Sequence, residues 1–157
     1  NGFRNLDLKI RTERPECTET YMRTRGSEIF EDQSLKDEGY SNDQIVSATH
    51  NLVKHRNDPT AHAEILAIQR ATKILNTPYL ENCDIYVTLE PCPMCASAIA
   101  WSRLRRLYFG AYDPKGGGVI HGPRVLEYTF QKPEIIGGIL EKECGLLLSD
   151  FFKNRRS

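Results

Sequence analysis

Apolar and polar positions follow a regular pattern from about residue 44 to the end of the chain. Short, nearly continuous apolar runs predict β-strands, at residues 44–50, 85–89, 105–110 and 135–140. Apolar residues at helical spacing predict helices, at residues 93–102, 124–128 and 141–156 and in a stretch that begins at Asp58–Thr60 and ends near Leu75. Strands that alternate with helices are typical of α/β domains, and we expect a three-layer α/β/α sandwich.

The first 44 residues have a different character. They carry many charges and few large apolar side chains in any regular period, so they are poorly able to offset the entropy cost of folding. We therefore expect residues 1–44 to form an atypical, weakly ordered segment with short helical turns at most. Residues 45–157 are enough for one domain with its own core.

The composition narrows the class of protein. The chain is 39% hydrophobic and 27% charged, as in ordinary globular proteins, and its formal net charge is zero, so any basic surface for nucleic acid has to be local. It contains neither an apolar run of about 18 residues nor the pattern of a signal peptide. Two of the five cysteines lie in a Cys-x-x-Cys, which fits metal-bound thiolates in a reducing compartment better than disulfides. We therefore expect a cytoplasmic protein.

Two short motifs carry the chemistry, a His-x-Glu and, about 30 residues later, a Pro-Cys-x-x-Cys. Their one imidazole and two thiolates are three zinc ligands, which leave a fourth position for water, as in catalytic zinc sites. Residues three apart on a helix share a face, so Cys92 and Cys95 can reach one ion. The sequence therefore predicts one Zn²⁺ per subunit, with His62, Cys92 and Cys95 as its ligands. Glu64 is the predicted catalytic residue, because it lies close enough to carry the proton of the water without binding the metal.

Two other interpretations of these motifs stay open. A closed structural zinc site needs a fourth protein ligand, for which His50, His55 and His121 are candidates. A redox-active Cys-x-x-Cys needs no third ligand, but it leaves His62 and Glu64 without a role.

The order His-x-Glu then Pro-Cys-x-x-Cys is the signature of zinc-dependent nucleobase deaminases. Beyond this signature, the chain from about residue 44 to the C-terminus resembles bacterial tRNA-specific adenosine deaminases, which have the cytidine deaminase-like fold. The similar strings lie at residues 57–64, 87–92, 109–113 and 148–152. Two of them, Asp-Pro-Thr-Ala-His-Ala-Glu and a Ser-Asp-Phe-Phe followed by basic residues, are similar to the tRNA-editing branch of the superfamily.

The resemblance implies a function and a set of contacts. The reaction would be the hydrolytic deamination of adenosine to inosine at the wobble position of a tRNA, by a homodimer that binds the anticodon stem-loop. Asn51 would contact the flipped nucleoside, and Asp113 would lie beside the bound nucleotides. Phe152 and Arg155 would meet the anticodon loop by stacking and by phosphate contact. Without the resemblance, Asn51 is a turn residue, Asp113 is a solvated loop carboxylate, and the C-terminal charges are an ordinary solvated tail.

Residues 1–44 do not match this family. Its members open with an amphipathic helix and with a strand that pairs with the one we place at residues 45–49. We expect the domain either to lack this first helix and strand or to cover the gap with another element. Two rival functions follow: deamination of a free base or nucleoside, such as guanine or cytidine, and an inactive zinc- or RNA-binding module.

Overall fold

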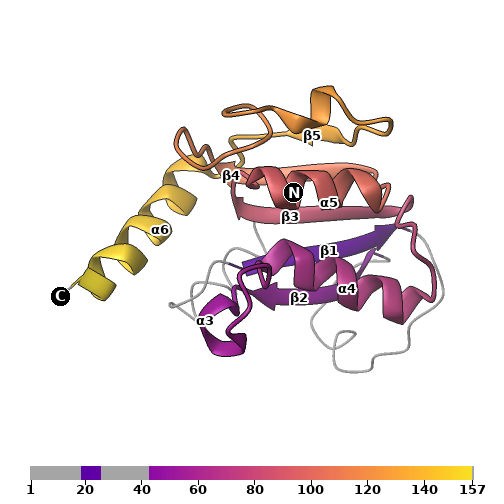
Figure 1. Cartoon of the computed structure of the whole chain (residues 1–157), viewed down its shortest axis with the longest axis horizontal. Coiled ribbons are helices and arrows are strands. Elements are labelled where there is room, and N and C mark those ends of the chain that lie inside the picture. The colour runs from indigo at the N-terminus through magenta and orange to yellow at the C-terminus, as the bar shows by residue number, and fades with distance from the viewer. Residues whose placement is uncertain (1–18, 26–42, 157) are drawn as a thin grey trace.

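The computed structural model describes residues 19–25 and 43–156 (Figure 1). Its strands are β1 (Glu19–Arg25), β2 (Asp43–His50), β3 (Cys83–Leu89), β4 (Arg106–Ala111) and β5 (Glu134–Ile136). Its helices are α3 (Val53–Arg56), α4 (Ala63–Leu75), α5 (Pro93–Trp101), α6 (Glu141–Arg156) and the 3₁₀ helix η1 (Val125–Glu127). None of these described helices combines the length and apolar character that crossing a membrane requires.

One mixed sheet joins the strands in the order β2-β1-β3-β4-β5. β1 is antiparallel to both of its neighbours, whereas β3, β4 and β5 are parallel to one another. Two antiparallel steps restore the direction, so β2 points the same way as β3 and β4. The residues that follow these three strands therefore gather at one edge of the sheet, where ligands of α/β sheets usually bind.

The sheet is covered by helices on both faces. Figure 1 shows α4 and α5 on one face, where the main apolar core includes Ala67, Ile99 and Phe109. Gly110 follows Phe109 in β4 and faces the other side, and there it lies against Cys144 of α6. The described residues thus form the expected three-layer α/β/α sandwich, with α6 as the third layer.

Residues 19–25, where the sequence analysis expected short helical turns at most, form a strand instead. They form β1, which lies between β2 and β3 and hydrogen-bonds to both. The strand beside residues 45–49 is therefore present. The sequence does not indicate β1, because Glu19, Arg23 and Arg25 interrupt the apolar alternation that is typical of a strand. The strand is held by backbone pairing with its two neighbours. The expected missing helix, and the rest of residues 1–44 apart from the start of β2, lie outside the described residues.

Other details of the secondary structure also differ from the prediction. α4 begins at Ala63 rather than at Asp58–Thr60, because Asp58 closes a turn in which its Oδ1 accepts hydrogen bonds from the N–H (2.8 Å) and the hydroxyl (2.7 Å) of Thr60. The short helix α3 occupies part of the predicted polar connection. β5 ends at Ile136, two residues before Gly138, whose φ of 77° is incompatible with a continuing strand.

Gly110 provides a test of the α6 layer. A Cβ at this position would meet the backbone oxygen of Thr88 at 2.8 Å as well as the side chain of Cys144, so Gly110→Ala should lower the free energy of unfolding by about 1–3 kcal/mol. Gly145→Ala is the matched control: nothing lies within 4 Å of its Cβ position inside α6, and the change should stabilise the protein by roughly 1 kcal/mol. Urea denaturation measures both, and equal effects would contradict the described packing of α6.

Candidate active site

His62 and Cys92 hold equivalent positions in the fold. Each is the residue just before a helix, α4 and α5 respectively, and each has an extended backbone (φ −69°, ψ 151° for His62; φ −67°, ψ 168° for Cys92). Neither side chain caps its own helix. Glu64 and Cys95 follow in the first turns, so the positive ends of two helix dipoles meet around these side chains.

Buried hydroxyls of β2 fix the start of α4 on the sheet. The hydroxyl of Thr49 donates to the backbone oxygen of Ala63 (2.7 Å), and the hydroxyl of Ser47 donates to that of Ala67 (3.1 Å). Thr49 and Ser47 are themselves buried. The position of His62 next to Ala63 is therefore set by hydrogen bonds to the sheet as well as by apolar packing.

The ligand atoms of His62, Cys92 and Cys95 all lie within 4.8 Å of one another, and His62 Nδ1 is 3.7 Å from Cys92 Sγ. Two ligands of one tetrahedral zinc ion are separated by roughly 3.5 Å, given bond lengths of about 2.0–2.3 Å. One nitrogen and two sulfurs are also a donor set that suits zinc. Among the described residues this is the one cluster of its kind, and it includes no second histidine as a fourth ligand, which speaks against a closed structural site.

The two thiols of this cluster titrate as a pair. The hydrogen bond from the Cys95 thiol lowers the pKa of Cys92 to about 5. The same bond, together with burial and the neighbouring Glu64 carboxyl, raises the pKa of Cys95. A second thiolate is thus disfavoured in the protein alone, and a divalent cation supplies the positive charge that would stabilise it.

Glu64 is half-buried, and burial raises the pKa of its carboxyl above the ordinary range. A hydrogen bond to Cys95 opposes this rise and places the carboxyl group directly beside the ligand cluster. A carboxylate with a raised pKa holds a proton more readily than an exposed one, which is the property needed to accept a proton and return it.

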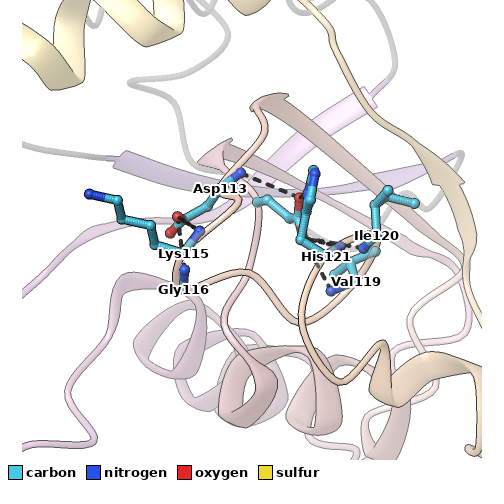
Figure 2. A network of polar contacts seen from close by, with 7 residues as sticks. Asp113, Lys115, Gly116, Val119, Ile120 and His121 are labelled. Atoms are coloured by element: carbon cyan, nitrogen blue, oxygen red, sulfur yellow. Dashed lines mark hydrogen bonds and ion pairs between the residues drawn. The ribbon is translucent and has the colours of Figure 1, made fainter.

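Glu90, at the end of β3, is a part of the site region that the sequence analysis missed. Its buried carboxylate accepts hydrogen bonds from the backbone N–H of Asp113, Val119, Ile120 and His121, and His121 Nδ1 lies 2.8 Å from its Oε1. Burial alone would raise the pKa of Glu90, but these hydrogen bonds outweigh it and hold the pKa below its ordinary value. Figure 2 shows the loop residues of this network. The glycine-rich pattern predicted a loop here but did not indicate that Glu90 holds it.

Asn51 and Asp113 follow β2 and β4 and so lie at the same edge of the sheet as the cluster. The Asn51 side-chain oxygen accepts the N–H of Val53 (3.0 Å), which is a turn contact. Asp113 Oδ1 accepts the N–H of Lys115 (3.1 Å) and of Gly116 (2.9 Å) and shapes the start of the loop (Figure 2). Both residues therefore have the structural role that was the alternative, and their contacts with a nucleoside stay predictions.

The structure places Phe152 and Arg155 in the last turns of α6, and this end of the helix projects away from the sheet (Figure 1). Phe152 is 53% exposed, while the side chain of Arg155 lies outside the described set. Phe152 is thus not part of the ligand cluster, and the contacts of both residues with an anticodon loop stay predictions.

Comparison with known proteins identifies the family. The sequence model of the MafB19-like deaminase family matches residues 39–156. A tRNA-specific adenosine deaminase of Rickettsia typhi is 44% identical over 118 residues, which are 74% of this chain and 80% of that protein. One of Bacillus subtilis is 45% identical over 117 residues, 73% of each chain.

A solved structure agrees with these sequence matches. It comes from biochemical and structural studies of A-to-I editing by tRNA:A34 deaminases at the wobble position of transfer RNA. It is similar to this chain with a TM-score of 0.68 and 34% sequence identity, over 82% of this chain and 83% of that one. Together with the His62, Cys92 and Cys95 cluster and the adjacent Glu64, these matches show that the chain belongs to the tRNA-specific adenosine deaminases, within the MafB19-like deaminase family.

Proposed function

We propose that the protein converts adenosine to inosine at the wobble position of a tRNA, by zinc-dependent hydrolysis. The observation that carries this proposal is the half-buried Glu64 carboxyl beside the His62, Cys92 and Cys95 cluster, in a chain 44–45% identical to curated tRNA-specific adenosine deaminases.

His62, Cys92 and Cys95 are the proposed zinc ligands. When bound, zinc lowers the pKa of water and so provides a strong nucleophile at neutral pH. Glu64 accepts a proton from the attacking water and delivers protons to the purine ring and to the departing amine. The oxygen of water thus replaces the amine, and the products are inosine and ammonia.

The substrate contacts are assigned to the edge of the sheet and to α6. An amide offers two N–H donors besides its oxygen, so we assign the Asn51 amide to the flipped nucleoside and its oxygen to the turn at Val53. Asp113 shapes the loop beside the nucleotides. Phe152 and Arg155 provide an aromatic ring and a guanidinium, which suit an unpaired anticodon loop.

The assembly proposed is a homodimer in the cytoplasm. Three large aromatic side chains are strongly exposed in the described part of the chain, Trp101 (82%), Tyr128 (85%) and Phe130 (109%), and they provide apolar surface for a second copy. Cys92 and Cys95 are proposed to work as metal-bound thiolates, which a reducing compartment preserves.

The first prediction concerns the metal. In zinc-free protein, Cys92 should react with iodoacetamide above about pH 5, because its lowered pKa leaves it as the thiolate there and protonates it below. Cys83 is the internal control: it is buried, burial raises its pKa to about 11, and it should stay unlabelled at neutral pH. Zinc should protect Cys92, as peptide mass spectrometry would show, whereas the raised pKa of Cys95 keeps its thiol unlabelled with or without the metal. Equal labelling with and without zinc would contradict the ligand assignment.

The second prediction concerns Glu64. Glu64→Gln should keep a full complement of zinc and lose activity by about 10²–10⁴-fold, because the amide cannot accept the water proton. Inosine formed in an anticodon stem-loop with adenosine at the wobble position measures activity, and elemental analysis measures zinc. Glu81→Gln, which removes an exposed carboxylate paired with Arg103, is the matched control and should leave both unchanged. A zinc-loaded Glu64→Gln variant with normal activity would refute the mechanism.

The third prediction separates tRNA editing from the deamination of a free base or nucleoside. Phe152→Ala and Arg155→Ala should each lower kcat/KM on the stem-loop by about tenfold, since stacking on an aromatic ring is worth roughly 1–3 kcal/mol per base. Leu146→Ala, at another exposed position of α6 (65%), is the control and should have no effect. Unchanged kcat/KM in both variants, together with rapid turnover of guanine or cytidine, would favour the rival function.

A further inference from the structure

The glycine-rich loop, defined here as residues 113–121, packs directly on the turn that carries Cys92. The N–H of Gly118 donates to the backbone oxygen of Pro91 (2.8 Å), and a Cβ on Gly118 would meet the backbone nitrogen of Pro93 at 2.5 Å. The loop and the turn are therefore in contact through their backbones, with no space for a side chain between them.

Glu90 holds the loop in this place. Its side chain is completely buried, and it accepts backbone hydrogen bonds from Asp113 (3.4 Å), Val119 (3.4 Å), Ile120 (3.2 Å) and His121 (3.0 Å). His121 Nδ1 lies 2.8 Å from its Oε1 and makes the fifth contact. Several donors converge on this one buried carboxylate. An amide cannot take its place, because the NH₂ group of the amide would face the N–H groups of the loop.

The same residue connects the loop to the ends of two strands. The backbone N–H of Glu90 donates to the oxygen of Ala111 at the end of β4 (2.8 Å), and Cys92 is only two residues further along the chain. The close approach of the loop to Glu90 requires glycine at position 117. A Cβ there would collide with the Glu90 carboxylate and would meet the backbone oxygen of Asp113 at 2.5 Å. Any shift of the Glu90 carboxylate is therefore transmitted to the turn at Cys92.

We propose that Glu90 is a positioning residue of the metal site: it clamps the glycine-rich loop on the Pro91–Pro93 turn and thereby fixes Cys92 opposite His62. This inference rests on the proposed zinc site. Glu90 does not act on the substrate, since its two carboxylate oxygens are engaged by the loop. Its role is to hold the sulfur of Cys92 where a metal shared with His62 requires it.

The test replaces zinc by cobalt, whose absorption reports the geometry of its thiolate ligands. Glu90→Gln should weaken Co²⁺ binding by about 10–100-fold in competition with a chelator. This is the usual loss when a residue that orients a metal ligand, without binding the metal itself, is replaced. It should also change the thiolate-to-cobalt absorption bands and accelerate amide hydrogen exchange at residues 119–121. Glu134→Gln is the matched control: it removes an exposed carboxylate that pairs with Arg106 at 2.6 Å, and it should leave all three measurements unchanged.

Two more variants keep the inference testable if Glu90→Gln folds poorly. Gly117→Ala should reproduce the loss of cobalt affinity with the carboxylate still present, because the new Cβ pushes the loop and Glu90 apart. Glu90→Asp, which keeps the charge on a shorter side chain, should recover part of the affinity. Combined with Glu90→Gln, Gly117→Ala should add less than its separate effect, since both changes disrupt one contact.

The outcomes distinguish this inference from the proposed function. Normal cobalt affinity and spectrum in Gly117→Ala and in a folded Glu90→Gln protein would overturn the positioning role and leave the zinc site intact. Failure of the wild-type protein to bind Co²⁺ would overturn the zinc site and the inference together. The predicted losses of affinity in a protein that forms no inosine would support the positioning role and refute the proposed reaction.

Discussion

α4 and α5 begin at the same edge of the sheet, and the candidate active site depends on the distance between these two starting points. His62 and Cys92 occupy the positions just before the helices, where the backbone is extended and the side chain is not needed as a cap. The parallel direction of β2 and β3 brings the two starts together, and it does so only because β1 lies between them, antiparallel to both. The separation of 3.7 Å between His62 Nδ1 and Cys92 Sγ is thus a consequence of sheet topology.

Charge explains why the cluster suits a cation. Two thiols and the Glu64 carboxyl lie beside one imidazole. The hydrogen bond between the thiols lowers the pKa of Cys92 and raises that of Cys95, and burial raises the pKa of Glu64, so further negative charge meets repulsion there. Helix N-termini offset part of this repulsion. A bound divalent ion would remove the rest of this repulsion. Glu64 would then be able to carry a proton without competing with the two thiols for it.

The sequence predicted the ligand cluster because its members lie in two local motifs, each at the start of a helix that the sequence also predicts. The predicted order of strands and helices from β2 to α6 was confirmed, apart from the additional short helix α3. The sequence analysis failed at β1, where Glu19, Arg23 and Arg25 obscure a central strand that is specified by pairing with residues far away in the chain.

Glu90 was missed for a related physical reason. Its partners lie 23 to 31 residues further on, and a single glutamate at the end of an apolar strand has no periodic signal. The available hint was a carboxylate after the largely apolar run Ile85–Leu89, together with three consecutive glycines. This pair indicates close approach of a backbone to a buried charge.

We assign the reaction and the choice of substrate to different parts of this fold. The ligand cluster and Glu64 come from the starts of α4 and α5, which are fastened to β2 and packed in the main core, so their chemistry is common to any amine-bearing ring that reaches them. The loop after β4 and the end of α6 lie outside that core and have their own anchors, Glu90 for the loop and the contact of Cys144 with Gly110 for α6. We therefore expect substitutions in the exposed parts of the loop and of α6 to change which nucleic acid is presented, as long as these anchors stay in place. The loop contacts the turn that carries Cys92 where Gly118 donates to Pro91, and it is there that we expect a change in the loop to reach this candidate metal ligand.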